Sequence, residues 1–225
     1  MIGPYALACL DMAGTTVRDD GAVEAAFDEA LVAVGIARGT PRYDEAHAFV
    51  RQTMGWSKAD VFAKLLDNPE AERATVQFAS AYEAIVAAGD VGPVPGAPEV
   101  LRDLRARGVR VCLTTGFAPS TRDALVDALE WRGAIDLALS PADVGRGRPA
   151  PDLILGAMAR LGVEDPNAVV VVGDTTSDLE AGAAARAGAV VGVLTGAHDE
   201  AALTAVPHTA ILPDITGLIG LLERS

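Results

Sequence analysis

Short apolar runs that alternate with helical patterns constrain the fold of this chain more than any other feature of its sequence. The apolar runs are Tyr5–Asp11, Val109–Thr115, Ile135–Leu139, Ala168–Asp174, Ala189–Leu194 and, more weakly, Thr209–Leu212. Helical patterns follow them at Pro98–Arg107, Ser120–Arg132, Asp152–Leu161, Ser177–Ala187 and Ile215–Glu223. This alternation is typical of βαβ units, so we expect an α/β fold with a parallel sheet that helices cover on both faces.

The stretch from residue 18 to residue 91 interrupts this alternation, because its patterns are nearly all helical. They are Ala22–Val34, Tyr43–Thr53, Lys58–Leu66 and Glu70–Ala88, and the Gly- and Pro-rich segment Gly89–Pro98 leads back to the strand-helix rhythm. A chain of 225 residues is long enough for one large domain and part of a second. We therefore expect a core domain of residues 1–17 and 92–225, with residues 18–91 inserted after the first strand as a helical cap domain.

The charge and composition exclude several classes of protein. The net charge of −13 argues against binding to nucleic acid or to an anionic membrane surface. No basic leader opens the chain and no apolar run reaches about 18 residues, so we expect a soluble cytoplasmic protein. Cys9 and Cys112 lie inside apolar runs and the three histidines lie far apart, which predicts buried free thiols and no histidine-based zinc site.

Polar residues stand where three of the predicted strands end and in a loop before a predicted helix. They are Asp11, the run Thr114-Thr115-Gly116, the run Gly173–Asp178, and Arg148 in the loop. Ligands of open parallel sheets bind outside the carboxyl ends of the strands, so we expect these groups to meet in one crevice. Carboxylates hold a hard cation, while hydroxyl, amide and guanidinium groups hold phosphoryl oxygens, so the set indicates Mg²⁺ and a phosphoryl group. The alternative is that Asp11 and Asp174 only cap helices.

These residues also resemble the four ordered motifs of the haloacid dehalogenase superfamily. The motifs are D-M-A-G-T-T at Asp11–Thr16, the strand-ending Thr114, Arg148, and G-D-T-T-S-D at Gly173–Asp178. The resemblance spans the chain, and the helical insertion lies where that superfamily has its type 1 cap. It implies a Rossmann-like core with a parallel sheet and an inserted helical cap.

The resemblance implies a role for each matching residue. Asp11 would be the nucleophile that forms an aspartyl-phosphoryl intermediate. It would ligate Mg²⁺ together with Asp174, the main-chain carbonyl of Ala13 and, directly or through water, Asp178. Arg148, where most of the superfamily has lysine, would neutralise charge in the transition state. The substrate-binding residues of the second motif would be Thr114, the Thr115 amide and Gly116.

One departure from the superfamily pattern narrows the expected substrate. Phosphatases of the superfamily mostly place a second aspartate, the general acid, two residues after the nucleophile, and here that position is Ala13. Loss of a general acid typically costs about 10²- to 10⁴-fold in rate. A phosphate monoesterase would therefore need its leaving group to be helped in another way.

The inserted helical module contains a lysine that would provide this help. Met54-Gly55-Trp56-Ser57-Lys58, together with D-x-A-G-T-T and Arg148, resembles the phosphonoacetaldehyde hydrolase (phosphonatase)-like branch of the superfamily. The resemblance implies that Lys58 forms a Schiff base with the substrate aldehyde, and that carbon then leaves phosphorus as an enamine, which needs no acid at Ala13. Such a lysine must be partly neutral, which burial under a closed cap achieves. Met54 and Gly55 would contribute to substrate binding.

Three positions differ from the residues typical of that branch. They leave open how protons reach the imine and what the carbonyl end of the substrate is. Phosphonatases typically have histidine where this chain has Val61, tyrosine where it has Phe117, and in some cases cysteine where it has Gly21. These changes favour a phosphonatase-like relative over phosphonatase itself. An exposed lysine at the start of a helix is also commonly a solvated charge or a clamp for the far end of a substrate.

The leading hypothesis is therefore a Mg²⁺-dependent hydrolase that cleaves the C–P bond of phosphonoacetaldehyde or a related 2-oxoalkylphosphonate. The alternative is a phosphatase for a small phosphate monoester, with Lys58 as a substrate-binding charge. A third hypothesis is a catalytically silent protein that binds a phosphorylated ligand. The expected partner is a small phosphonate or phosphate, with no nucleic acid or membrane, and the resemblance suggests a possible homodimer.

Overall fold

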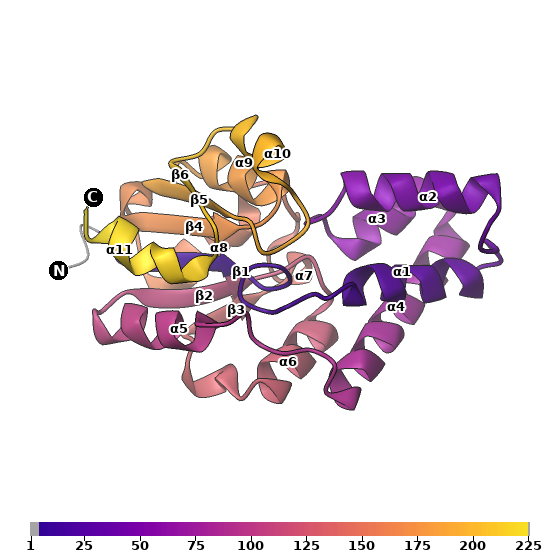
Figure 1. Ribbon diagram of the computed structural model, residues 1–225, viewed down its shortest axis with the longest axis horizontal. Coiled ribbons are helices and arrows are strands. Elements are labelled where there is room, and N and C mark those ends of the chain that lie inside the picture. The colour runs from indigo at the N-terminus through magenta and orange to yellow at the C-terminus, as the bar shows by residue number, and fades with distance from the viewer. Residues whose placement is uncertain (1–4, 225) are drawn as a thin grey trace.

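The computed structural model describes residues 5–224 and contains a six-stranded sheet in the order β3-β2-β1-β4-β5-β6 (Figure 1). The strands are β1 Leu7–Asp11, β2 Arg110–Thr114, β3 Leu137–Leu139, β4 Val169–Gly173, β5 Ala189–Val193 and β6 Ala210–Leu212. Every strand is parallel to its neighbours, which confirms the predicted α/β fold. Because β1 lies between β2 and β4, the ends of these three strands meet at one edge of the sheet.

Helices cover both faces of this sheet, as expected for strands that are apolar throughout. They are α5 Ala97–Ala106, α6 Pro119–Ala128, α7 Pro141–Val144, α8 Asp152–Leu161, α9 Thr176–Ala184, α10 Glu200–Thr204 and α11 Leu218–Leu222. Leu10 of β1 belongs to one buried cluster, which includes Leu101 of α5, whereas Cys9 belongs to another, which includes Ile154 of α8. Successive residues of β1 therefore point to opposite faces, and both faces are buried.

The insertion after β1 is a group of four helices, which we call the cap segment: α1 Ala22–Ala33, α2 Pro41–Gln52, α3 Lys58–Leu65 and α4 Asn68–Ala88. Figure 1 shows it beside the sheet, on the side away from the two chain termini. Phe27 of α1 packs against Phe62 of α3 and Phe78 of α4, with ring centroids 5.1 and 4.7 Å apart. The division of the chain into core and cap domains at residues 18 and 91 stays a prediction, and its residues 1–4 lie outside the described residues.

Local signals explain where several of these helices begin and end. Thr40 caps α2 by accepting the Tyr43 amide, and Pro41 follows it at the first helical position. The long helix α4 ends at Gly89, whose φ of 81° is readily adopted by glycine. Although α4 has 21 residues, no helix between residues 5 and 224 is long and apolar enough to cross a membrane.

The structure differs from the sequence prediction at short elements. The helix expected to reach Arg132 ends at Ala128, because Glu130 adopts a left-handed φ of 56° and a 3₁₀ turn, Trp131–Gly133, follows. The helix expected from Ile215 divides into a 3₁₀ turn, Ile215–Gly217, and α11. Helices α7 and α10 were not predicted, because four or five residues are too few to show a helical period.

Candidate active site

The sheet edge where β1, β2 and β4 end forms one wall of a cavity. Asp11 is the last residue of β1, Asp174 follows β4, and Thr115 follows β2. Arg148 reaches the same cavity from the loop between α7 and α8, and Lys58 enters from the cap segment. The cavity measures about 50 Å³, which corresponds to about four water-sized occupants at roughly 10–15 Å³ each. It is therefore suited to a small ligand.

Arg148 lies between two buried carboxylates. Its Nη1 donates to Asp11 Oδ1 at 2.5 Å and also to Asp178 Oδ1. Burial raises the pKa of Asp11 to about 6, although the neighbouring Arg148 opposes this rise. Burial also disfavours the charge on Arg148, but Asp11 and Asp178 together raise its pKa above the ordinary value. The guanidinium is therefore held as a cation against the proposed nucleophile.

Asp174 is held in place by groups from two loops, one after β1 and one after β5. Thr15 Oγ1 donates to Asp174 Oδ1 at 3.0 Å, and the Ala197 amide donates to Oδ2 at 2.8 Å. Gly14 passes so near, with a φ of 88°, that a Cβ there would lie 2.5 Å from Asp174 Oδ2. Burial, with the nearby charge of Asp11, raises the pKa of Asp174 well above its ordinary range. This carboxylate is thus fixed in place but short of positive charge.

The donor set here fits a hard divalent cation. Asp11, Asp174 and Asp178 each offer an oxygen within 4.8 Å of the others. Asp178 is further oriented by Thr175, whose Oγ1 donates to it at 2.5 Å and whose amide donates at 3.2 Å in the capping box that begins α9. Arg148 pairs with Asp11 and Asp178, and Asp174 accepts only uncharged donors among the described residues, so a bound Mg²⁺ would balance the remaining negative charge. Ala13, the predicted carbonyl ligand, also lines the cavity.

Two of the three residues predicted for the second motif, Thr115 and Gly116, line the cavity, and Thr114 lies beside it in the sheet. Thr114 ends β2 and its hydroxyl faces the Leu10 carbonyl at 3.5 Å, whereas Thr115 and Gly116 line the cavity. The Thr115 amide donates to the Leu139 carbonyl at 3.1 Å, so it is engaged in the sheet. The Thr115 hydroxyl accepts the Phe117 amide at 3.2 Å and can turn its hydrogen toward a ligand. The cavity therefore offers the Thr115 hydroxyl in place of the predicted Thr114 hydroxyl and Thr115 amide.

Lys58, the first residue of α3, carries its amine into an aromatic enclosure. Nζ lies 5.4 Å from the ring centroid of Phe117, 5.6 Å from that of Phe27 and 5.9 Å from that of Phe78. Among the described residues, Nζ donates one hydrogen bond, a long one, to the Trp56 carbonyl at 3.5 Å. Burial and the charge of Arg148 together lower the pKa of Lys58 to about 8, although carboxylates including Asp11 oppose the fall. This lysine is buried, not a solvated surface charge.

Main-chain contacts fix the cap segment against the sheet edge beside Lys58. The Lys58 amide donates to the Gly116 carbonyl at 3.1 Å, and Ser177 Oγ donates to the Met54 carbonyl at 3.3 Å. Gly116 must be glycine, because a Cβ there would collide with the Trp56 carbonyl. The predicted Met54 and Gly55 do line the cavity, whereas Trp56 is outside its lining and contributes a carbonyl oxygen.

Several residues that line the cavity carry no signal in the sequence. They are Asp19, Val23, Gly196 and Ala197. Asp19 lies in an ordinary polar turn before α1, and Ala197 acts through its amide, which any residue could supply. The family's histidine and tyrosine positions, Val61 and Phe117, are both buried and apolar.

The parallel sheet and the polar groups at its strand ends define the chain as an α/β protein of the Rossmann-like class, with a helical insertion after β1. More specifically, the chain belongs to the haloacid dehalogenase-like hydrolase family, which matches residues 5–186. It is 31% identical to a phosphonoacetaldehyde hydrolase of Bacteroides fragilis over 96% of this chain and 86% of that protein. It is also 30% identical to a probable phosphatase, IndB, of Dickeya dadantii over 95% of this chain and 92% of that protein.

The fold is shared with solved structures. A hydrolase from Pseudomonas syringae superimposes with a TM-score of 0.85 at 25% identity, over 98% of this chain and 99% of that one. The named relatives include both a phosphonate hydrolase and a probable phosphatase. Membership of the family therefore establishes a hydrolase and leaves the choice of substrate to the site.

Proposed function

We propose that this chain is a Mg²⁺-dependent hydrolase that cleaves the C–P bond of phosphonoacetaldehyde or a related 2-oxoalkylphosphonate. The observation that carries the proposal is the buried Lys58 amine, which shares a cavity with Asp11 and whose pKa is lowered to about 8. At that pKa a substantial fraction of the amine is neutral near physiological pH and can attack a carbonyl. The relative from Bacteroides fragilis, named for this reaction, supports the same choice.

The residues of the cavity divide the reaction between them. The neutral Lys58 amine bonds to the substrate carbonyl carbon, water leaves, and the resulting protonated imine withdraws electrons from the C–P bond. An Asp11 oxygen then bonds to phosphorus while the C–P electron pair becomes the double bond of an enamine. Arg148 and the Thr115 hydroxyl bind the phosphoryl oxygens. The enamine then gains a proton from solvent at the carbon that left phosphorus, which restores the iminium ion, and water hydrolyses this ion to acetaldehyde and free Lys58. A second water hydrolyses the aspartyl phosphate to phosphate and free Asp11. Mg²⁺, when bound, would neutralise charge on the nucleophile and phosphoryl group.

The residue at position 13 favours an enamine carbon over an alkoxide as the leaving group. Ala13 lines the cavity at the place where the family's phosphatases mostly carry their general acid, and its methyl group can transfer no proton. An enamine carbon departs without protonation at oxygen, because the iminium nitrogen accepts the electron pair. The alanine at position 13 and the buried lysine are therefore consistent with the same reaction.

A phosphatase for a small phosphate ester is the second candidate. The probable phosphatase of Dickeya dadantii, similar over nearly its whole length, favours it. In that reaction Lys58 would act as a cation that holds the substrate, and the leaving group would need its proton from solvent or from the substrate. An amine whose pKa burial lowers is a weak choice for a permanent charge clamp, which places this candidate second.

Phosphate release distinguishes the two candidates. The purified protein with Mg²⁺ would be assayed against phosphonoacetaldehyde and against a panel of sugar and acyl phosphates of similar size. We expect phosphonoacetaldehyde to have the highest kcat/KM of the compounds tested and to yield acetaldehyde and phosphate in equal amounts. Faster turnover of a phosphate ester, without turnover of the phosphonate, would contradict it. Loss of every activity in Asp11→Asn excludes a silent binding protein.

A further inference from the structure

Among the described residues, five titratable side chains line the cavity, and the proposed function uses only four of them. Asp11 attacks phosphorus, Asp174 belongs to the cation site, Arg148 neutralises charge and Lys58 forms the imine. The fifth is Asp19, which precedes α1 and shares the cavity with Lys58. A partly buried carboxyl group beside a reactive amine is a candidate for proton transfer.

Asp19 is held in place by one of its two carboxylate oxygens. Its Oδ1 accepts the Val23 amide at 2.9 Å in the first turn of α1. Among residues 5–224 its Oδ2 makes no hydrogen bond, and the side chain lines the cavity together with Val23 and Lys58. The charge of Asp19 acts on Lys58, where it opposes the fall in the lysine's pKa. Asp19 is thus held by the backbone amide of Val23 in the cavity that also contains the Lys58 amine.

Imine chemistry at Lys58 needs a proton carrier that the other nearby side chains do not supply. A carbinolamine must gain a proton at oxygen to lose water, and the same proton must return when the imine is hydrolysed. Val61 and Phe117, at the positions of the family's histidine and tyrosine, are apolar, and Gly21 has no side chain. The carboxylates of Asp11 and Asp174 are engaged with Arg148 and with Thr15 and Ala197.

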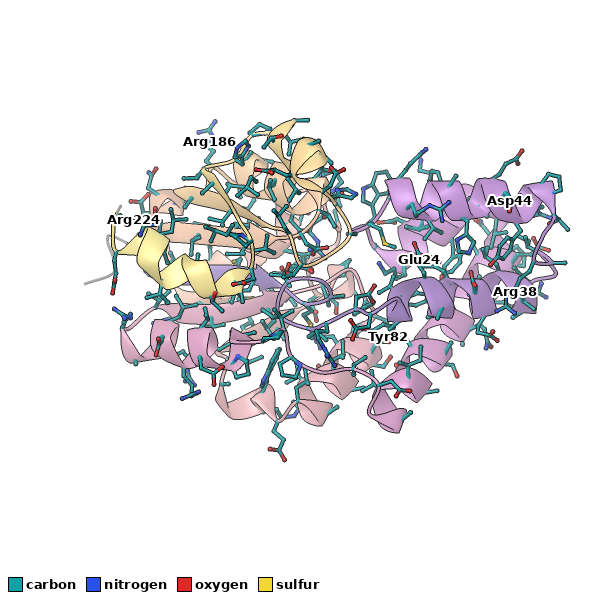
Figure 2. All side chains as sticks on the ribbon, in the orientation of Figure 1. Glu24, Arg38, Asp44, Tyr82, Arg186 and Arg224 are labelled. Carbon is teal, nitrogen blue, oxygen red and sulfur yellow. The ribbon has the colours of Figure 1, made fainter. Side chains whose placement is uncertain are left out.

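The groups around Asp19 support this role. Lys58 of α3 lowers the pKa of Asp19, Glu24 of α1 and the adjacent Asp20 raise it, and the largest effect, burial, leaves it raised. Tyr82 of α4 contributes a buried hydroxyl that has no hydrogen-bond partner among residues 5–224. Burial, together with the charges of Asp19 and Asp11, raises the pKa of Tyr82 above its ordinary value, so it stays protonated. Figure 2 labels Glu24 and Tyr82 in this part of the molecule.

We propose that Asp19 is the acid–base residue for imine formation and hydrolysis at Lys58. The inference rests on the proposed function, because it assigns the proton transfers of that reaction. As the Lys58 nitrogen bonds to the carbonyl carbon, the Asp19 carboxylate takes a proton from the nitrogen and the carbonyl oxygen becomes an alkoxide. Asp19 delivers that proton to this oxygen, and the hydroxyl leaves as water when it gains a second proton from solvent through Asp19. The nitrogen lone pair forms the C=N bond of the iminium ion.

The chain offers a matched pair of variants for the test. Asp19→Asn keeps an oxygen that accepts the Val23 amide, so the start of α1 is preserved while the proton-transfer group is lost. Asp19→Ser keeps a shorter cap acceptor and serves as a second variant if the first folds poorly. Asp20→Asn is the control, because Asp20 is exposed, pairs only with Arg18 at 3.4 Å, and has a left-handed φ of 44° that asparagine tolerates.

The measurement is the rate at which borohydride traps an imine on Lys58, with phosphonoacetaldehyde and separately with acetaldehyde. Asp19→Asn and Asp19→Ser are expected to slow trapping with both aldehydes by about 10²- to 10⁴-fold. Asp20→Asn is expected to match the wild type, and all three variants should keep the wild-type melting temperature. Wild-type trapping rates in both Asp19 variants would overturn the proposal.

The two aldehydes separate this inference from the proposed function. If the wild type forms an imine with acetaldehyde but releases no phosphate from phosphonoacetaldehyde, C–P hydrolysis is wrong, while the acetaldehyde rates still decide the role of Asp19. If the wild type forms no imine at Lys58 with either aldehyde, the role of Asp19 is overturned as well.

Discussion

The two walls of the cavity differ in the partners that they give to buried charged groups. On the sheet side, Arg148 donates to both Asp11 and Asp178, and Asp174 accepts from Thr15 and Ala197. On the cap side, Lys58 faces three aromatic rings and one distant carbonyl oxygen. Pairing maintains the Arg148 cation on the sheet side, which we call the paired wall. Isolation destabilises the Lys58 cation on the cap side, which we call the isolated wall.

The pKa values record this difference. Burial is the largest influence on Asp11, Arg148 and Lys58 alike. The paired Arg148 nevertheless has its pKa raised, because two carboxylates more than compensate for burial. The unpaired Lys58 has its pKa lowered to about 8, because the rings cannot compensate. The same desolvation thus yields a permanent cation on one wall and a nucleophilic amine on the other.

The largest effect on activity is expected from substitution of Asp11 on the paired wall. Asp11→Asn removes the oxygen nucleophile and leaves Arg148 with one carboxylate partner, so we expect phosphate release to fall by about 10⁴- to 10⁶-fold. The assay is phosphate release under saturating Mg²⁺, with Asp103→Asn, an exposed aspartate of α5, as the control. Residual activity close to the wild type would show that another group attacks phosphorus.

The second largest effect on activity is expected from substitution of Lys58 on the isolated wall. Lys58→Arg keeps a cation of similar length but cannot form an imine, so we expect turnover of phosphonoacetaldehyde to fall by about 10³-fold or more. The control is Lys64→Arg, since Lys64 is exposed on the same helix and is the only other lysine in the sequence. Lys58→Arg with nearly full activity would mean that Lys58 serves only as a charge.

Removing the charge of Lys58 should lower activity but raise the stability of the fold. A pKa lowered from 10.5 to about 8 corresponds to a cost of about 3 kcal/mol for keeping Lys58 charged in the folded state. Lys58→Met, which keeps the stem and removes the charge, should therefore raise the free energy of unfolding by up to that amount at pH 7. The native state binds fewer protons than the unfolded state between pH 8 and 10.5, so the gain should shrink as pH rises through that window.

Urea unfolding of wild type and Lys58→Met at pH 7 and at pH 10 measures this gain. A variant that is less stable than the wild type at pH 7, or a gain that grows with pH, would contradict the description of Lys58 as an isolated charge.

The smallest effect concerns Tyr82, whose hydroxyl is buried without a partner among the described residues. Tyr82→Phe removes an unsatisfied polar group, so we expect the free energy of unfolding to rise by about 1 kcal/mol. Tyr43→Phe is the matched comparison, because the Tyr43 hydroxyl interacts with Asp28 and Arg38 and its loss should destabilise the fold. Equal effects of the two substitutions in thermal unfolding would show that Tyr82 is satisfied.

The paired wall was largely predictable from the sequence. Asp11, Arg148 and Asp174 follow apolar runs or precede a helical pattern, and parallel topology brings strand ends together whatever the loop details. Two adjacent threonines stand at the end of one strand, so the sequence does not show which of them faces the cavity; the structure places Thr115 in the lining and Thr114 in the sheet. Strand β2 ends at Thr114, so Thr115 is the first residue beyond it. The Thr115 amide still donates to the Leu139 carbonyl of β3.

The isolated wall was predictable only in part. Met54, Gly55 and Lys58 were identified from a short motif, but the rings around the amine were not. Phe27 and Phe78 lie on α1 and α4, far apart in the sequence, and they meet only because these helices pack against each other. Asp19 was missed for a similar reason, since its position before α1 acquires meaning only when α3 places Lys58 in the same cavity.

The most direct test of the account is the site of covalent trapping. The protein would be incubated with Mg²⁺ and phosphonoacetaldehyde, reduced with borohydride, and mapped by peptide mass spectrometry. The account predicts an ethyl group on Nζ of Lys58 and an unmodified Lys64, with no adduct in Lys58→Arg. The absence of an adduct on Lys58 while phosphonoacetaldehyde is being hydrolysed would contradict it.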